Sequence, residues 1–164
     1  MRVPALGRKI VSARRAAAGV RRLQRRGRVV VFTNGCFDLL HAGHIALLDA
    51  ARDQGDFLVV GVNTDRSVRR LKGPGRPIVP LRERMEVLGA LRPVDCVVPF
   101  GGTTPARLVA LLCPDVLVKG SDYRNRTIVG RDTVLASGGR VVTVPLRRGR
   151  STTDLIRRAL RAAG

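Results

Sequence analysis

The sequence predicts an α/β fold in which five parallel strands carry helices on both faces of the sheet. Short apolar runs recur along the chain, and segments with helical periodicity lie between them. The runs are continuous rather than alternating, as is typical of strands that are buried on both faces. The sequence contains no internal repeat and no low-complexity linker. We therefore predict one domain over residues 1–164, Rossmann-like, with right-handed crossovers.

The strands are expected at the most apolar runs, which are Val29–Phe32, Phe57–Val62, Cys96–Phe100, Val116–Val118 and Val141–Val144. Helices are expected at 5–26 (N-cap Ser12, stop Gly27), Ile45–Ala51, Arg66–Leu71, Pro80–Leu91, Pro105–Leu112 and after Ser151. The first of them makes residues 1–27 a basic N-terminal helix that packs on the domain. In such a fold the carboxyl ends of the strands meet at one edge, where open α/β sheets bind their ligands.

The chain is strongly basic, with a formal net charge of +19 at pH 7. Residues 1–28 hold ten basic groups and no acidic one, which is compatible with an arm that binds nucleic acid. However, the chain has only four Phe, one Tyr and no Trp, so aromatic platforms for base stacking are scarce. We expect no specific nucleic-acid partner, and only weak, salt-sensitive binding of the kind that charge alone produces.

Apolar length and cysteine count indicate the compartment. No apolar run approaches the ~20 residues of a membrane span, and no hydrophobic segment follows the N-terminus as in a secretory signal. Three cysteines, an odd number far apart in sequence, suit a reducing cytosol better than a disulfide framework. We expect a cytoplasmic protein with no membrane partner.

The residues that indicate chemistry lie in Thr33–His44, a predicted strand-to-helix turn. It holds both histidines of the chain, His41 and His44, three residues apart where i and i+3 share a helix face. Gly35 and Gly43 let the backbone come close to another group, and the first N–H groups of a helix bind anions. These features predict a phosphate cradle with two imidazole donors.

Two other interpretations of the histidine pair remain open from the residues alone. The rings could simply cap or pack the helix. Their spacing would also suit zinc, but no third-ligand pattern accompanies the pair and the three cysteines are scattered. We expect no protein ligands for a metal.

The segment Asn34–His44 reads N-G-C-F-D-L-L-H-A-G-H and resembles the HxGH signature of the cytidylyltransferase-like nucleotidyltransferases. Within that superfamily it is most similar to the D-glycero-β-D-manno-heptose 1-phosphate adenylyltransferases. The resemblance extends over about residues 28–160 and includes the family's RLKG-x-x-RP stretch at Lys72–Pro77 and its KGxDY segment at Lys119–Tyr123. Cytidylyltransferases place an Arg five residues before Ser151, where this chain has Leu146, which favours the heptose branch.

The resemblance implies roles for individual residues. The expected catalytic residues, which would hold phosphate oxygens, are His41, His44, Lys72 and Arg84. The expected nucleotide-binding residues are Asn34, Gly35, Cys36, Phe37, Gly43, Lys119, Asp122, Tyr123, Ser151, Thr152 and Thr153, the last three at a helix N-terminus that also suits a triphosphate. The expected residues for the second substrate are Asp38, Asn63 and Asp65.

Several of these residues have simpler explanations on the sequence alone. Asp65 could cap the short helix that follows it, and Arg84 could be an ordinary solvated arginine. Ser151 is expected as an N-cap whether or not it also binds phosphate. The segments Lys72–Pro77 and Lys119–Tyr123 could be a generic loop and a plain turn.

The activity implied by the resemblance is transfer of AMP from ATP to a sugar 1-phosphate. D-glycero-β-D-manno-heptose 1-phosphate would give ADP-heptose and pyrophosphate, with Mg²⁺ entering on ATP. A homodimer is expected, and so is a separate sugar kinase, because the family is often fused to such a kinase and this sequence has no kinase segment. The alternatives are a cytidylyltransferase or adenylyltransferase for another phosphate, such as glycerol 3-phosphate or FMN, and a basic nucleic-acid-binding protein.

Overall fold

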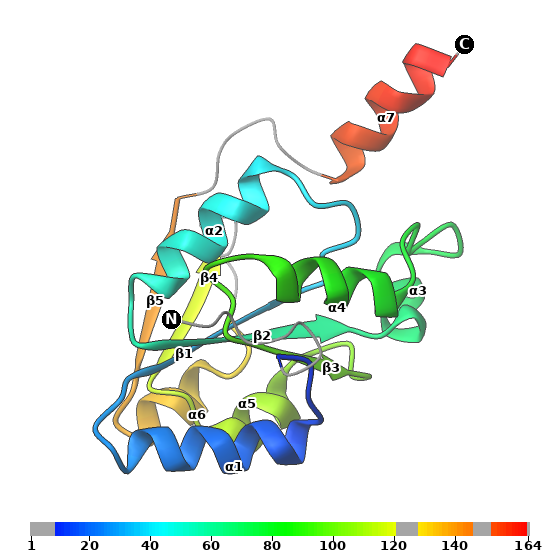
Figure 1. The fold of residues 1–164 in the computed structure, drawn as a ribbon. Coiled ribbons are helices and arrows are strands. Elements are labelled where there is room, and N and C mark those ends of the chain that lie inside the picture. The colour runs from blue at the N-terminus through cyan, green and yellow to red at the C-terminus, as the bar shows by residue number, and fades with distance from the viewer. Residues whose placement is uncertain (1–8, 121–127, 146–151, 164) are drawn as a thin grey trace.

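A computed structural model describes residues 9–120, 128–145 and 152–163. Within these residues five strands form one sheet in the order β3-β2-β1-β4-β5, and every neighbouring pair is parallel. The strands are β1 (Val30–Gly35), β2 (Phe57–Asn63), β3 (Cys96–Phe100), β4 (Val116–Gly120) and β5 (Arg140–Val144). The predicted five-stranded parallel α/β fold is therefore confirmed (Figure 1).

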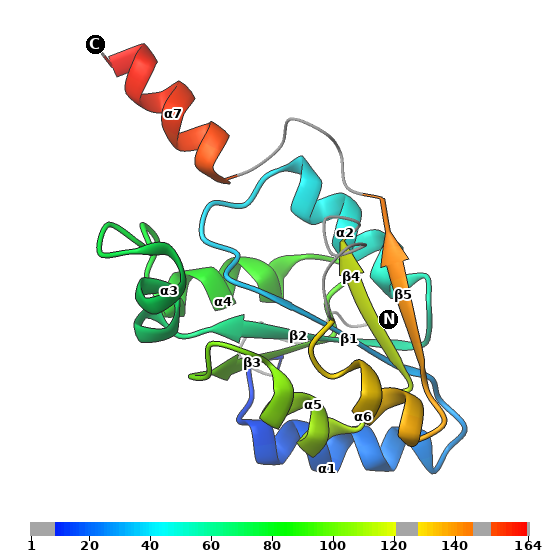
Figure 2. The same cartoon turned by 180° about the vertical axis from the view of Figure 1, so that it is seen from behind.

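The strand order reverses at β1, which pairs with β2 on one side and with β4 on the other. The chain first builds β2 and β3 outward from β1, then crosses to the far side to add β4 and β5 (Figure 2). A reversal of this kind opens a crevice at the carboxyl ends of the two central strands. The turn that follows β1, with its two histidines, lies at that point.

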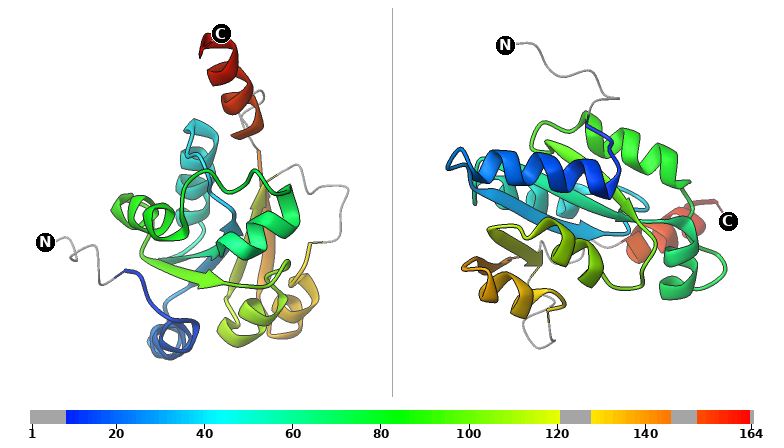
Figure 3. Two further views of the ribbon diagram at one scale, coloured as in Figure 1. Left: turned by 90° about the vertical axis from the view of Figure 1, so that its right-hand side faces the viewer. Right: turned by 90° about the horizontal axis from the view of Figure 1, so that it is seen from below.

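The helices form layers on both faces of the sheet (Figure 3). On one face lie α1 (Ala13–Gln24), α5 (Ala106–Leu112) and α6 (Arg131–Ala136), and on the other lie α2 (Ala42–Arg52) and α4 (Leu81–Ala90). The helix α3 (Asp65–Lys72) follows the end of β2, and α7 (Thr152–Ala163) extends away from the body. None of the helices in the described ranges is long and apolar enough to cross a membrane.

Two apolar cores, one on each face, hold the layers together. Under α1, the side chains of Ala16, Ala17 and Val20 join a cluster with the buried strand residues on that face. Under α2, Leu48 and Ala51 pack in the second cluster. Each fully buried Val or Leu in such a cluster contributes about 1.5–3 kcal/mol relative to an exposed one. The two cores fix the strands, and thus the positions of the loops at their carboxyl ends.

The helix boundaries differ from the prediction in ways that have local causes. The helix expected at Ile45 begins at Ala42, because His41 supplies the N-cap. At the N-terminal helix, the Ser12 side chain accepts a hydrogen bond from the Arg15 N–H, as expected for an N-cap, although α1 spans Ala13–Gln24 rather than 5–26. The six-residue α6 was not predicted, because its length gives little periodicity. The expected sites at Asp122, Tyr123, Leu146 and Ser151 lie outside the described residues.

Candidate active site

A cavity of about 550 Å³ opens at the carboxyl ends of the central strands. Its wall includes most of the residues proposed from the sequence, namely Asn34, Gly35, Cys36, Phe37, Asp38, His41, Gly43, His44, Asn63, Lys72, Lys119, Thr152 and Thr153. Segments from 33 to 153 thus come together in one place. The wall also contains residues that sequence reasoning missed: Thr33, Leu47, Leu71, Arg76, Thr103, Thr104, Pro105, Gly120 and Val129. Two proposed residues, Arg84 and Asp65, are not part of this wall.

His41 both caps α2 and faces the cavity. Its backbone is extended (φ −145°, ψ 169°), and its Nδ1 accepts a hydrogen bond from the Gly43 N–H at 3.1 Å. A ring nitrogen that accepts a hydrogen bond carries no proton, so a neutral His41 bears its proton on Nε2. The capping explanation and the donor explanation are therefore compatible, because the cap uses Nδ1 and not Nε2–H.

His44 stacks against His41 with ring centroids 3.8 Å apart and an interplanar angle of 23°. Its other ring neighbour is Phe37, at 5.2 Å between centroids. Burial, and then the neighbouring His41, lower the pKa of His44 to about 4, so the ring is neutral at pH 7. The Nδ1 of His44 is buried and has no hydrogen-bond partner among the described residues. The two stacked rings thus form one continuous surface on the cavity wall.

The position of the Phe37 ring explains why β1 ends in a glycine, Gly35. A Cβ on Gly35 would lie 3.2 Å from Cε2 of Phe37, which is closer than ordinary side-chain contacts allow. Phe37 reaches this position because its backbone is left-handed (φ 48°), which is uncommon for a residue other than glycine. The tight turn brings the buried Phe37 ring beneath His44. Gly35 therefore makes room for the Phe37 ring, and it also lines the cavity.

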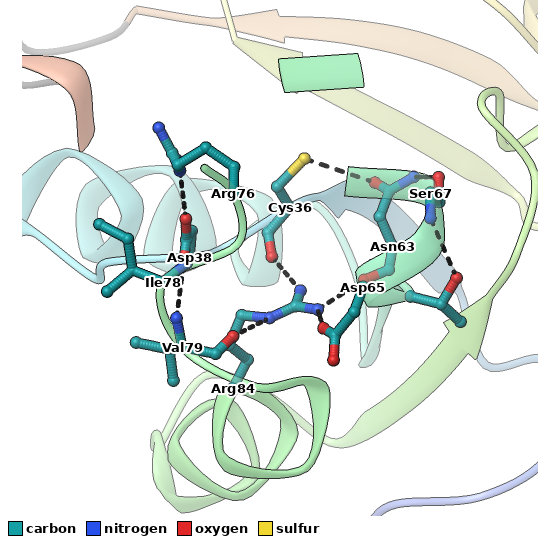
Figure 4. A network of polar contacts seen from close by, with 10 residues as sticks. Cys36, Asp38, Asn63, Asp65, Ser67, Arg76, Ile78, Val79 and Arg84 are labelled. Atoms are coloured by element: carbon teal, nitrogen blue, oxygen red, sulfur yellow. Dashed lines mark hydrogen bonds and ion pairs between the residues drawn. The ribbon is translucent and has the colours of Figure 1, made fainter. Parts of the chain in front are cut away.

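Asp38 joins the histidine turn to the segment that precedes α4 (Figure 4). Its side chain has no exposed surface, and its carboxylate accepts hydrogen bonds from the backbone N–H groups of Ile78 at 2.8 Å and Val79 at 2.9 Å. It also forms an ion pair with Arg76, with 2.5 Å between Nε and Oδ2. Although Asp38 reaches the cavity wall, both carboxylate oxygens are already engaged within the protein.

Arg84 lies in a buried layer beneath the cavity, away from the position that the sequence suggested. Its guanidinium, with no exposed surface, donates to the carbonyls of Cys36, Val79 and Asn63 and to the carboxylate of Asp65 at 2.7 Å. These contacts tie the end of β1 to the end of β2 (Figure 4). Asp65 is thus occupied by Arg84, and Thr64 rather than Asp65 caps α3.

Positive charge surrounds the cavity. Lys72 ends α3 at the wall, and Lys119, 5% exposed at the end of β4, donates to the side-chain oxygen of Asn34. Burial raises the pKa of the Cys36 thiol, and the charges of Lys72, Arg84 and Arg76 oppose that rise. The positive charges of three side chains therefore act on the Cys36 thiol in the cavity wall. Imidazole rings flanked by cations suit a polyphosphate ligand.

The model of one family, described as cytidylyltransferase-like, matches residues 32–158. The chain belongs to the cytidylyltransferase-like family. This membership confirms the resemblance given by the HxGH segment and the predicted enzyme class, a nucleotidyltransferase. The matched region begins in β1 and includes every segment that contributes to the cavity wall.

Among cytidylyltransferase-like relatives, the bifunctional protein HldE of Halorhodospira halophila is 54% identical over 155 residues, which are 94% of this chain and 32% of that protein. HldE of Alkalilimnicola ehrlichii is 57% identical over 132 residues, or 80% of this chain and 28% of that protein. The chain spans about a third of the length of these curated relatives.

Solved structures agree on the fold. The lipopolysaccharide core biosynthesis protein from Thermoplasma volcanium superposes with a TM-score of 0.61 at 28% identity, covering 76% of this chain and 100% of that one. The pantoate-β-alanine ligase of Francisella tularensis, solved with β-γ ATP and β-alanine, gives a TM-score of 0.58 at 14% identity, over 85% of this chain and 67% of that one. The second likeness concerns the fold alone.

Proposed function

We propose that this chain transfers AMP from ATP to a sugar 1-phosphate, D-glycero-β-D-manno-heptose 1-phosphate in the first place. An oxygen of the sugar phosphate attacks the α-phosphorus of ATP, the bond to pyrophosphate breaks, and ADP-heptose and pyrophosphate leave. The observation that carries the proposal is the stacked pair His41 and His44 in a cation-flanked cavity. Such a displacement requires no protein nucleophile, only aligned reactants and stabilisation of the charge that develops on the phosphates.

The roles of the side chains follow from their positions. The imidazoles of His41 and His44 donate hydrogen bonds to oxygens of the reacting phosphates. Lys72 adds positive charge from the end of α3, and the N-terminus of α7 adds free N–H groups with the hydroxyls of Thr152 and Thr153. Arg84 and Asp38 hold the turn in the shape that the donors require.

The choice of nucleotide and sugar is supported by the relatives. HldE proteins are 54–57% identical over 80–94% of this chain, and a lipopolysaccharide core biosynthesis protein shares its fold. ATP rather than CTP is supported by the similarity of 34–44, 72–77 and 119–123 to the heptose adenylyltransferases and by Leu146.

Mg²⁺ is proposed to enter with ATP. The described residues contain no group of three His, Cys, Asp or Glu arranged as a cage for a metal ion. No step above depends on such a cage. We also propose that the protein works in the cytoplasm as a homodimer and receives its sugar phosphate from a sugar kinase.

The test is pyrophosphate release across a grid of four nucleoside triphosphates and several phosphates, including the heptose 1-phosphate, glycerol 3-phosphate and FMN. ATP with the heptose phosphate should exceed every other pair by at least about tenfold in kcat/KM, a difference of about 1.4 kcal/mol. A lead for CTP with glycerol 3-phosphate would contradict the substrate assignment. Tight, salt-resistant duplex DNA binding without turnover would contradict the enzymatic function altogether.

A further inference from the structure

The loop between β3 and α5 forms a part of the cavity wall for which the sequence suggested no role. Thr103, Thr104 and Pro105 line the cavity, and the two threonines are exposed. A threonine hydroxyl both donates and accepts hydrogen bonds, and it carries no charge. This part of the wall therefore offers neutral hydrogen-bonding groups, in contrast to the lysines and imidazoles elsewhere.

The loop is fixed by the neighbouring strand and helix. The carbonyl of Gly102 accepts hydrogen bonds from the hydroxyl of Ser67 at 2.6 Å and from Nδ2 of Asn63 at 3.2 Å. Arg70 donates to the carbonyl of Gly101 at 2.6 Å. A Cβ on Gly102 would lie only 2.7 Å from the carbonyl oxygen of Thr104, so the loop folds tightly on itself. The two threonines are thus presented by an anchored loop.

The same contacts orient the side-chain amide of Asn63. Its Nδ2 donates both to Ser67 Oγ at 2.9 Å and to the carbonyl of Gly102, so both amide hydrogens are used. Its Oδ1 accepts a hydrogen bond from the thiol of Cys36 at 4.0 Å (Figure 4). Asn63 also belongs to the cavity wall. A ligand therefore meets Asn63 as an oriented acceptor, and Ser67 holds it in that orientation.

The sheet order separates this neutral wall from the opposite side of the cavity. Asn63 and the loop follow β2 and β3, whereas Lys119 follows β4, on the other side of the central β1. Lys72 and Arg76 also line the cavity, so one cavity can bind both a phosphate and neutral hydroxyls. That combination matches a polyhydroxylated phosphomonoester better than the triphosphate of a nucleotide.

We infer that Asn63 Oδ1 and the hydroxyls of Thr103 and Thr104 select the second substrate by its hydroxyl groups, with Ser67 as a positioning residue. The inference rests on the proposed function and deepens it, because it names the side chains that distinguish one sugar phosphate from another. A site that hydrogen-bonds a substrate hydroxyl discriminates strongly against analogues that lack it, since its own polar groups are then left unpaired.

The experiment compares Thr103→Val, Thr104→Val and Ser67→Ala with Thr133→Val, a matched change on α6 away from the cavity wall. Steady-state kinetics are measured with the heptose 1-phosphate and with a series of monodeoxy sugar 1-phosphates. At least one threonine variant and Ser67→Ala should lose about tenfold or more in kcat/KM for the sugar phosphate, with the KM for ATP within about twofold of wild type. For the deoxy analogue that lacks the recognised hydroxyl, the same variant and the wild type should be equal.

Failure of the inference can be distinguished from failure of the proposed function. If the wild type releases pyrophosphate but all three variants keep their preference among the sugar phosphates, the inference is wrong and the proposed function stands. If they raise the KM for ATP instead, the loop belongs to the nucleotide side and the inference is again wrong. If the wild type releases no pyrophosphate with any sugar phosphate, the proposed function fails and the inference fails with it. Thr133→Val should match the wild type in every assay.

Discussion

His44 and Arg84 were both expected to contact phosphate, yet they lie in different layers of the molecule. His44 is on the cavity wall, neutral and in contact with His41. Arg84 lies beneath the wall, with three carbonyls and one carboxylate around its guanidinium. The wall presents groups that can still bind a ligand, whereas the buried layer has used its hydrogen bonds within the protein.

This difference shows what each layer contributes. A buried arginine that joins the ends of two strands cannot bind a phosphate without leaving carbonyls unpaired, which costs about 1–3 kcal/mol for each group. It can, however, keep the donors above it in a fixed geometry, and fixed donors stabilise developing charge without reorganisation. Changes in the buried layer should therefore lower stability first, and changes in the wall should lower the reaction rate first.

The largest expected effect is on stability, from Arg84→Met. Removal of the guanidinium takes the hydrogen-bond donor from three carbonyls, at about 1–3 kcal/mol for each acceptor left unsatisfied, and the ion pair from Asp65, whose side chain is 33% exposed. Arg82→Met on the same helix is the control, since its pair with Glu86 is exposed and worth at most about 1 kcal/mol. Urea unfolding measures both. Equal losses would show that Arg84 has no special structural role.

Asp38→Asn should have the next largest effect. The carboxylate accepts from two backbone N–H groups and pairs with Arg76, so an amide there loses about 1–3 kcal/mol. Amide hydrogen exchange at Ile78 and Val79 should become faster, because their acceptor is weakened. Asp49→Asn, at an exposed position on α2, should leave this exchange unchanged. If exchange at Ile78 and Val79 stayed as slow as in the wild type, Asp38 would not anchor the segment.

Lys72→Ala removes the most exposed cation among the described residues of the cavity wall. We expect kcat to fall about tenfold or more with a smaller change in the KM for ATP, because its charge stabilises the transition state more than bound ATP. Unfolding should match the wild type. Arg69→Ala, on the same helix but outside the cavity wall, serves as the control. A raised KM with unchanged kcat would assign Lys72 to uniform substrate binding.

A further prediction concerns the pH dependence of stability due to His44. Its pKa is about 4 in the folded protein and near 6.5 when unfolded, so between these values the unfolded chain binds more protons. Stability should therefore fall as the pH drops from about 6.5 to about 4, and should not change through this group above 6.5. In urea unfolding, His44→Gln should have a flatter acid limb. Parallel curves would mean that His44 is not buried as a neutral ring.

The sequence predicted the features whose residue pattern has one common structural or chemical explanation. Continuous apolar runs indicated all five strands, and the paired histidines in a glycine-containing turn indicated the wall. The charge of Arg84 suggested contact with phosphates, whereas its helical spacing indicates burial. It precedes the buried Leu88 by four residues, so both lie on the inner face of α4.

The β3–α5 loop could not be predicted to contribute to the wall. Its residues carry no charge and match none of the motifs by which the site was found. What brings Thr103 and Thr104 into the wall is an anchor from Asn63 and Ser67, about forty residues earlier in the chain. Such long-range hydrogen bonds leave no periodicity in the sequence. The sequence suggested that Asn63 contacts the second substrate, but it could not predict that Asn63 also holds the loop.

The most direct test of the account is the rate of pyrophosphate release from ATP and the heptose 1-phosphate by His44→Ala and His41→Ala. Each variant should unfold cooperatively above the assay temperature and yet lose on the order of a hundredfold or more in kcat, the loss expected when one donor to a developing negative charge is removed. That result would confirm that the stacked pair does the chemistry at the cavity wall. A folded His44→Ala variant that releases pyrophosphate at the wild-type rate would contradict it.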